Sequence, residues 1–434
     1  MSRKAISLIL IAFGFSILYS YIPCASMATA QVEGYITEDT IWSLENSPYI
    51  IVNDIIVEPG VKLTITPGVV VKFANGTNMI IDGTLIGSGN ETYRVKFTSN
   101  NTIPKPGDWG HIWFRSTSVS SILNWTTVEY GVKAIYVYRY GSNVSILNSE
   151  IRYNQYAALV EPYSILKVRN CNFMNNTYGI YSEPESTLEV QTCHFMNNTR
   201  GITAEEDNTK IYTSTFFDNG EAIYAGLIRL EVYSSNFSRN MWAIRGRRAT
   251  LYITGSSIID NNHGLCCPNI EVSCSIISGN QGTGIACNYS LQITNCTITD
   301  NQQNGITCEG YNPAQKEIHF CNIYNNTPYD VFNKEYFGFD VNATLNWWGT
   351  ENETYIEEKI YDYYDDYSYS KVIFKPYLNE PAIISEGFSS LLVMMLFMIA
   401  TLLVVIVYRR KRPKSDFAKS EVEKCSSSRM RIYS

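Results

Sequence analysis

A repeat of about 21 residues runs through the middle of the chain and limits what it can fold into. A small residue, Gly or Ala, is followed by an aliphatic residue at nine places: Ala134-Ile135, Ala157-Ala158, Gly179-Ile180, Gly201-Ile202, Ala222-Ile223, Ala243-Ile244, Gly264-Leu265, Gly284-Ile285 and Gly305-Ile306. The successive spacings are 23, 22, 22, 21, 21, 21, 20 and 21 residues. A period of this length in so many copies indicates a solenoid, in which each repeat contacts its neighbours.

An asparagine stands three residues before the small residue in six copies. These are Asn154, Asn176, Asn198, Asn219, Asn240 and Asn261. If successive turns stack, the asparagines form a column whose amides donate and accept hydrogen bonds along the stack and satisfy buried turn backbone. A small residue precedes each asparagine by five positions and a bulky apolar residue by three, as with Cys171 and Phe173 before Asn176. This alternation predicts short strands.

The pattern predicts an all-β fold, a parallel β-helix over residues 31–350. The segments between the strands show no helical periodicity, and Leu is too scarce at the core positions for a leucine-rich repeat. About 14 turns at roughly 4.8 Å each would give a rod on the order of 65 Å long. Residues 351–386, rich in Tyr and acidic residues, should form a cap and stalk, with Ile356, Ile360 and Tyr364 on one face of a helix. Its carboxylates could instead bind Ca²⁺.

The two ends of the chain predict export and membrane attachment. Residues 1–30 have a basic start, an apolar stretch and a small-residue pattern ending at Ala30, which is typical of a cleaved secretory signal. Residues 387–408 predict one transmembrane α-helix, because Phe388 to Tyr408 lacks charged residues. The basic tail 409–434 should stay in the cytoplasm. We therefore expect a single-pass protein of the cell membrane with an extracellular ectodomain.

Glycosylation sequons support an extracellular location for the body of the chain. Thirteen Asn-x-Ser/Thr sequences all lie between the two apolar segments: Asn75, Asn90, Asn100, Asn124, Asn143, Asn175, Asn197, Asn236, Asn288, Asn295, Asn325, Asn342 and Asn352. An Asn-rich repeat also produces sequons by chance, so we expect some of them to be occupied and not all.

Three motifs carry a family resemblance. They are the repeated Asn-x-x-Gly-Ile turn, the early Gly107-Asp108-Trp109-Gly110, and Asn346-Trp347-Trp348-Gly349-Thr350 followed by Ile360-Tyr361-Asp362. With these the chain resembles right-handed parallel β-helix repeat proteins of the pectate-lyase-like class, especially archaeal surface proteins. The resemblance implies a right-handed coil. The class includes polysaccharide lyases, hydrolases and exported proteins that mature copper sites, and a shared fold does not choose among these activities.

Nine of the eleven cysteines lie in the expected ectodomain, most of them at repeat positions. Cys267, Cys287 and Cys308 should form an inward ladder, and Cys171 and Cys193 an adjacent pair. Stacked residues about 4.8 Å apart are within reach of a disulfide, so buried thiols and disulfides are both open.

A metal site is a weaker alternative. His263 with Cys266 and Cys267, or Cys193-His194 with Met196, offers soft ligands for copper or zinc. Cys193 fits the inward ladder, however, and His194 should point the opposite way. We expect no metal and no cofactor.

The outward positions give the functional expectation. Two residues after each Gly or Ala, where a catalytic β-helix would show stacked carboxylates, there are none; Tyr136, Tyr181, Tyr224 and Arg245 occur there instead. Aromatic rings suit sugars and Arg suits carboxylates. We expect a non-enzymatic surface protein that binds cell-envelope glycans or proteins through this face, with no catalytic residues. The alternatives are a membrane-tethered polysaccharide lyase or glycoside hydrolase, and a copper-handling β-helix. The net charge of −7 gives no reason to expect nucleic acid.

Overall fold

The computed structural model describes residues 29–384, apart from 116–119, 140, 206–207, 228, 311–313 and 337–338. The expected transmembrane segment and basic tail lie outside the described residues. The expected signal also lies outside them, except for its last two residues, Thr29 and Ala30. Within the described part, no helix combines the length and apolar composition needed to cross a bilayer.

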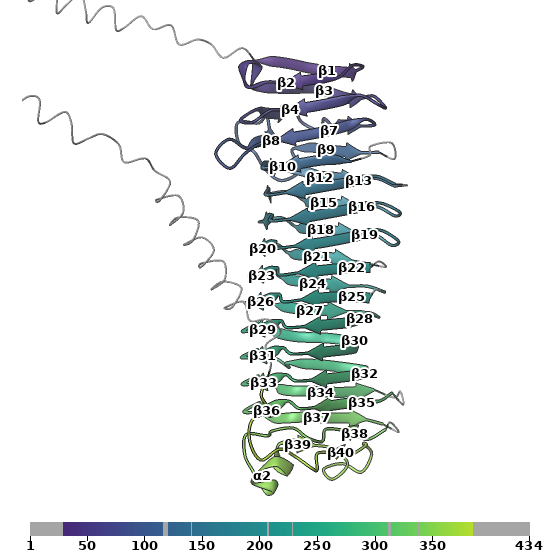
Figure 1. Ribbon diagram of the computed structural model, residues 1–434, viewed down its shortest axis with the longest axis vertical. Helices are drawn as coiled ribbons and strands as arrows, with labels where there is room; N and C mark the ends of the chain where they lie inside the picture. Colours follow the sequence, from purple (N-terminus) through teal and green to yellow (C-terminus); the bar gives the residue numbers. More distant parts are fainter. Residues whose placement is uncertain are drawn as a thin grey trace, which may run out of the picture. The chain divides into compact units, whose positions relative to one another are not determined.

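The described chain is a coil of short parallel strands arranged in three ladders, with successive coils following one another along one axis (Figure 1). This confirms the expected parallel solenoid. Four long strands pass from one ladder to another or open the coil: β1 (Ala30–Ile36), β3 (Tyr49–Val57), β30 (His263–Ser273) and β32 (Ile285–Thr294). Two short helical segments complete the elements: a 3-10 turn at Leu44–Asn46 and α2 (Glu353–Glu358).

The first ladder contains mostly three-residue strands. These are β5 (Val70–Phe73), β8 (Val95–Ser99), β11 (Thr126–Glu129), β14 (Glu150–Arg152), β17 (Asn172–Met174), β20 (His194–Met196), β23 (Thr215–Phe217), β26 (Asn236–Ser238), β29 (Ser257–Ile259), β31 (Ile276–Ser278), β33 (Thr297–Thr299) and β36 (Asn322–Tyr324). Phe173, Phe195, Phe216 and Phe237 stack inside this ladder with ring centroids 4.8 Å apart. The apolar residues of successive repeats therefore form a column in which neighbouring rings are one coil spacing apart.

The second ladder contains the Gly/Ala-aliphatic pairs. Its strands are β6 (Met79–Ile81), β9 (Trp109–Phe114), β12 (Gly131–Val137), β15 (Tyr156–Val160), β18 (Tyr178–Ser182), β21 (Arg200–Ala204), β24 (Glu221–Ala225), β27 (Trp242–Gly246), the first halves of β30 and β32, β34 (Asn304–Gly310), β37 (Tyr329–Glu335) and β39 (Ile360–Tyr361). The Gly is needed because neighbouring backbone is close: a Cβ on Gly179 would lie 2.3 Å from the carbonyl oxygen of Gly201.

The third ladder follows after a variable loop. Its strands are β2 (Thr40–Trp42), β4 (Lys62–Ile65), β7 (Thr84–Ser88), β10 (Ser121–Asn124), β13 (Asn143–Leu147), β16 (Ile165–Arg169), β19 (Thr187–Gln191), β22 (Asn208–Tyr212), β25 (Arg229–Tyr233), β28 (Thr250–Thr254), the second halves of β30 and β32, β35 (Lys316–His319), β38 (Val341–Asn342) and β40 (Val372–Ile373). Its outer face carries ion pairs between coils, for example Lys210 Nζ to Glu231 Oε2 at 3.3 Å. Such cross-strand pairs favour the native register.

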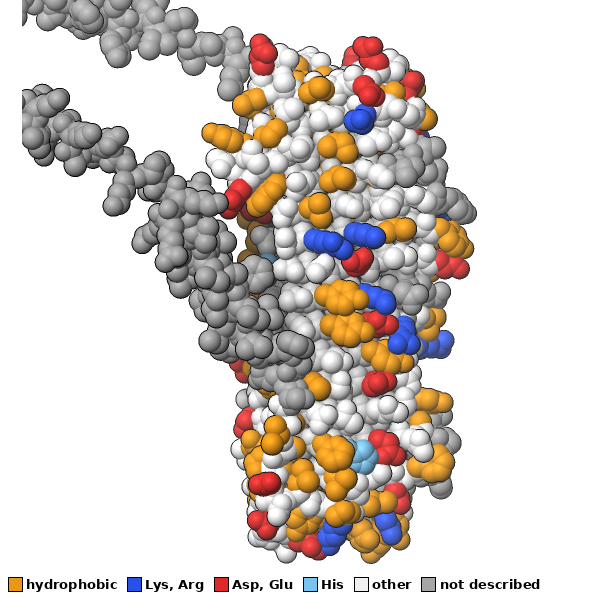
Figure 2. Space-filling view, in the orientation of Figure 1, with side chains coloured by type: hydrophobic (Ala, Val, Ile, Leu, Met, Phe, Trp, Pro, Cys, Tyr) orange, Lys and Arg blue, Asp and Glu red, His pale blue; other side chains and the backbone are white. Residues whose placement is uncertain are grey.

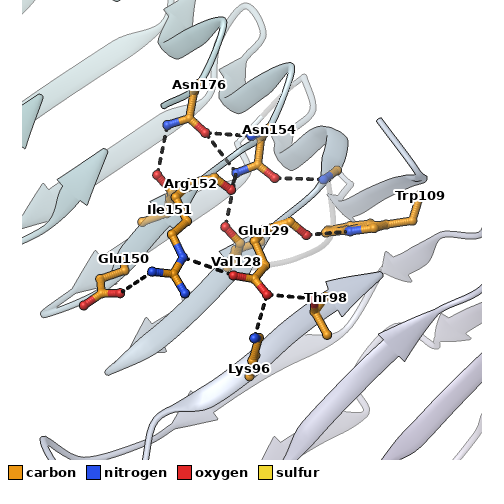
Figure 3. A network of polar contacts seen from close by, with 11 residues as sticks. Lys96, Thr98, Trp109, Val128, Glu129, Glu150, Ile151, Arg152, Asn154 and Asn176 are labelled. Carbon is orange, nitrogen blue, oxygen red and sulfur yellow. Dashed lines mark hydrogen bonds and ion pairs between the residues drawn. The ribbon is translucent and has the colours of Figure 1, made fainter. Parts of the chain in front are cut away.

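The asparagines between the first and second ladders are buried and hydrogen-bonded to one another. Asn219 Oδ1 accepts from the backbone N–H and the Nδ2 of Asn198, both at 3.0 Å. Its Nδ2 donates to the carbonyl oxygens of Phe195 (2.9 Å) and Phe217 (3.2 Å). The same bonds link Asn154 with Asn176 (Figure 3). Each asparagine therefore satisfies turn backbone that a buried aliphatic side chain would leave unpaired.

The ladder ends at a carboxyl group. Asp330 Oδ1 accepts from the backbone N–H (3.1 Å) and the Nδ2 (2.8 Å) of Asn326, in the position that the next asparagine would occupy. Burial raises the pKa of Asp330 to about 6, although the two hydrogen bonds oppose the shift.

The cap is less helical than the sequence predicts. Helix α2 ends at Glu358, and Ile360 continues the second ladder as β39. Ile356 and Trp348 are buried against the last coil, but Tyr364 is 72% exposed, so the expected helical face through Tyr364 is wrong. Asp362 is buried and accepts from the backbone N–H groups of Tyr364 and Val372. Pairing of Ile360 with the last coil therefore decides the backbone conformation here, although its spacing from Ile356 suits a helix.

Removing one ladder side chain should destabilise the coil. Asn219→Ala leaves the backbone N–H of Asn198 and the carbonyl of Phe195 without their buried partner, so we expect the free energy of unfolding to fall by about 3 kcal/mol or more. Asn236→Ala, at an exposed position of β26 in the next coil, should change it by roughly 0.5 kcal/mol at most. Urea unfolding of both variants measures the difference, and equal midpoints would refute the role of the ladder.

Asp330 should make stability depend on pH. Its folded pKa of about 6 lies above the usual 3.8, so the folded state binds the proton more tightly and ionisation at neutral pH is a cost. Asp330→Asn keeps the acceptor oxygen without the charge and should raise the free energy of unfolding by roughly 2 to 3 kcal/mol near pH 8. The gain should shrink as the pH falls below 6 and vanish below about pH 3, where both states are protonated. Asp218→Asn is the control, because Arg239 lowers the pKa of Asp218; it should show no gain near pH 8, and an equal gain there would contradict the assignment.

Candidate functional site

The outer face of the second ladder carries three columns of side chains in register. The middle column contains Tyr136, Leu159, Tyr181, Thr203, Tyr224 and Arg245. The column on one side contains Lys133, Tyr156, Tyr178, Arg200, Glu221, Trp242 and His263. On the other side, at the ends of the strands, backbone hydrogen bonds between coils align Tyr138, Glu161, Glu183 and Glu205. We call these three columns the tyrosine face.

The four residues expected to form a binding face do share one column, but they differ in exposure. Tyr136 is only 7% exposed, which corrects the expectation that it faces solvent. Its ring is packed against Trp113 (5.7 Å) and Tyr138 (5.7 Å). Tyr181 and Tyr224 are half-buried, whereas the Arg245 side chain is 50% exposed. Leu159, the next residue of the column, is 5% exposed, so the accessible part begins at Tyr181.

A tyrosine cluster forms the middle of the face. Tyr156 and Tyr178 stack with centroids 4.6 Å apart, and Tyr181 meets both rings edge-on at 6.0 and 5.8 Å. The Arg200 guanidinium lies 5.8 Å from the Tyr178 ring and 5.1 Å from the Tyr224 ring. Arg200 and Arg245 both pair with Glu221, at 2.7 and 3.0 Å. The result is an amphipathic surface with aromatic rings between charged groups.

Three glutamates are stacked beside the tyrosines, contrary to the sequence expectation. Glu161, Glu183 and Glu205 follow one another at 22-residue spacing, four residues after the small residue. Glu161 accepts from the Tyr136 hydroxyl and from Arg139 Nε at 2.9 Å. Glu205 accepts a long hydrogen bond, 3.5 Å, from the Tyr181 hydroxyl. Burial, together with the charge of Glu205, raises the pKa of Tyr181 to about 12.

Glu183 differs from the other two glutamates. Glu161 and Glu205 form hydrogen bonds or ion pairs, whereas the Glu183 carboxylate forms none with the described residues. Burial raises its pKa, and the neighbouring Glu161 charge raises it further, while Lys133 and Arg139 act in the opposite direction. Nearby, burial and the charge of Lys133 lower the pKa of His111. A carboxyl group whose pKa is raised beside a second carboxyl group is an arrangement that general acids in enzymes also use.

The sequence contained a signal for both side columns. One column lies directly before the small residue and the other lies four positions after it. The residues directly before the first seven small residues are Lys133, Tyr156, Tyr178, Arg200, Glu221, Trp242 and His263. The position two after the small residue shows only the middle column of the face.

A hollow of about 200 Å³ continues the face beyond Arg245. Its floor contains Cys266, Ala286 and Thr307, which follow Arg245 in the middle column, and Arg247 and Glu309 stand at its sides. The hollow exists because these residues are smaller than the Tyr and Arg before them. Another hollow, of about 620 Å³, lies in the cap between α2 and β40. In neither place, nor elsewhere in the described chain, do three His, Cys, Asp or Glu side chains converge as metal ligands would.

The nine described cysteines are free thiols. Cys267, Cys287 and Cys308 lie in direct register and are buried, and Cys171 and Cys193 are buried in adjacent coils. Burial raises the pKa of Cys287 to about 11, so its thiolate is scarce. The structure thus corresponds to the buried-thiol alternative, and pairing under oxidising conditions stays a prediction. His194 is exposed and Cys193 buried, so these neighbours do not share one face.

A second carboxylate cluster is structural. Glu129 is buried and accepts from Thr98 (2.8 Å) and Arg152 (3.1 Å) and pairs with Lys96 (2.6 Å), as Figure 3 shows. Although burial acts to raise the pKa of Glu129, these contacts together lower it. A carboxylate held ionised by three partners is suited to joining coils, not to proton transfer.

None of the thirteen sequon asparagines is buried. On the side drawn in Figure 2, hydrophobic side chains recur along the length of the coil, with basic and acidic side chains next to one another between them.

Comparison with known proteins supports the fold. Residues 49–225 match the family model described as the right handed beta helix region. No curated protein matches the chain. Among solved structures, the A-module of the mannuronan C-5 epimerase AlgE6 of Azotobacter vinelandii is 13% identical, with 76% of this chain and 91% of that chain covered and a TM-score of 0.31. A TM-score this low supports no inference about activity.

The ladders that begin in the matched region continue with the same pairing to Ile373. The described part of the chain therefore folds as a right-handed parallel β-helix.

Proposed function

We propose that this chain is a β-helix protein of the cell surface that binds a glycan along its tyrosine face. The observation that carries the proposal is the contiguous platform of Tyr156, Tyr178 and Tyr181, flanked by Arg200 and Arg245. Aromatic faces pack on sugar rings, and guanidinium groups pair with hydroxyls and carboxylates. Columns repeated at the coil spacing suit a polymer that lies parallel to the axis.

The hollow beyond Arg245 supports the same direction of binding. A chain lying on the tyrosines would pass Arg245 and reach the floor of Cys266, Ala286 and Thr307, where Arg247 is exposed. Attachment by the apolar segment 388–408 and glycosylation at the sequons belong to the proposal as well. They rest on the sequence, and on the accessibility of the sequon asparagines.

The tyrosine platform can be tested by a matched pair of substitutions. Tyr181→Ala should weaken binding to the glycan that a glycan array identifies for the full-length protein by about tenfold, because one stacking surface is worth roughly 1 to 1.5 kcal/mol. Tyr212→Ala removes a stacked tyrosine from the third ladder, where it lies 5.2 Å from Tyr233, and should leave binding unchanged. Equal affinity of Tyr181→Ala and the wild type, or equal losses in both variants, would contradict the proposed face.

A second candidate function, cleavage of the bound polysaccharide, is favoured by Glu183. Glu183, whose pKa is raised, lies one coil from Glu161, and Lys133 and Arg139 supply cations on the same surface. The carboxylates are one coil apart, and paired carboxylates perform acid and nucleophile or base roles in glycoside hydrolysis.

Product release separates the two functions. If the chain cleaves its ligand, Glu183→Gln should lower the rate of release of shortened sugars about 100-fold or more and leave affinity nearly unchanged. Glu189→Gln, on the third ladder where Glu189 pairs with Arg169, should behave as wild type. If the wild-type protein binds a glycan and releases no product from it, the catalytic candidate is refuted and the binding function stands.

A further inference from the structure

A lysine and a glutamate face each other inside the coil near its C-terminal end. Lys316, in β35, occupies an inward position that Leu291 holds in the coil before it. Glu335 is the last residue of β37 and lies against Gly310, which leaves room for its carboxylate. Both side chains are at most 1% exposed, and Lys316 Nζ is 3.0 Å from Glu335 Oε1.

This pair lacks the bonds that normally stabilise buried charges. Lys316 Nζ and both carboxylate oxygens of Glu335 have no hydrogen-bond partner of acceptable geometry among the described residues. Desolvation of two charges is offset only when the geometry is good and further hydrogen bonds satisfy both groups. Asn333, the nearest inward amide along β37, already donates to the carbonyl oxygen and the hydroxyl of Ser370. Condensation of the two groups into an amide would remove both charges from the interior.

We propose that Lys316 and Glu335 are joined by an isopeptide bond. Lys316 Nζ, as the free amine, attacks the Glu335 carboxyl carbon; the new C–N bond forms, the C–OH bond breaks, and the hydroxyl leaves with a proton from the nitrogen as water. No oxidant or other reactant is needed. Fixed contact between two buried groups corresponds to effective concentrations on the order of 10⁵ M or more, which favours condensation that is unfavourable in dilute solution.

The location of the bond gives it a physical purpose. A solenoid is held by contacts between neighbouring coils only, so its ends open first. Lys316 and Glu335 belong to the third and second ladders of the last coils, and the backbone carbonyl of Glu335 accepts from Ser370 of the cap. A covalent link here joins the last coils next to the segment that leads to residue 384. A force applied to the chain at that end would act first on these coils.

The mass of the purified full-length chain tests the proposal. Lys316→Gln removes the amine while the residue mass stays almost the same, so after removal of glycans the wild-type chain should be lighter than the variant by the mass of one water. Lys210→Gln is the matched control, because Lys210 pairs with Glu231 at 3.3 Å on the surface. That variant should have the wild-type mass, including the missing water. Equal masses for the wild type and Lys316→Gln would overturn the proposal.

A second measurement is independent of whether the variant folds. An acylated lysine is not cleaved by trypsin, so the denatured wild-type chain should remain uncut after Lys316 and yield a branched peptide containing Glu335. Complete cleavage after Lys316 would overturn the bond. A mass deficit of one ammonia, with the branch at Asn333, would likewise overturn the assignment to Glu335.

Discussion

The coil is stable only if the buried backbone N–H and C=O groups of the turn in every repeat find hydrogen-bond partners, and the partner side chain must be small. The asparagine column meets this need, since each amide bonds to the preceding asparagine, to the next one and to strand carbonyls. Because these bonds run between coils, they also fix the register of all three ladders. A one-residue slip would break the column and turn the inward side chains outward. Columns of phenylalanine, cysteine and tyrosine are consequences of that register.

A fixed register also turns a short motif into an extended surface. A side chain repeated once per coil reappears one coil spacing away, which is close to the size of a ring or a carboxylate. Tyr156 and Tyr178 can stack for this reason, and the charge of Glu161 raises the pKa of Glu183 for the same reason. Binding and catalysis would therefore use the same geometry, and the difference between them rests on whether a carboxyl group such as Glu183 keeps its proton.

The C-terminal end of the coil follows other rules. There the asparagine column meets Asp330 instead of another asparagine, and the aliphatic inward column meets Lys316. Both replace a self-complementary side chain by a charged one, and both are buried. The last coil has no following coil whose side chains could pair with its own. Titratable side chains and the irregular strands of the cap occupy those positions instead.

The period alone determined the parallel coil, the buried asparagine column, and the common column of Tyr136, Tyr181, Tyr224 and Arg245, because residues separated by one period must stack. It could not determine exposure: Tyr136 is covered by Trp113 and Tyr138, which come from other parts of the face. The helix expected through Tyr364 failed because pairing of Ile360 with Val331 decided the backbone there. The Lys316–Glu335 contact, the isolation of Glu183 and the hollow beyond Arg245 required the tertiary structure, since each depends on side chains from different ladders or on the sizes of neighbouring residues in space.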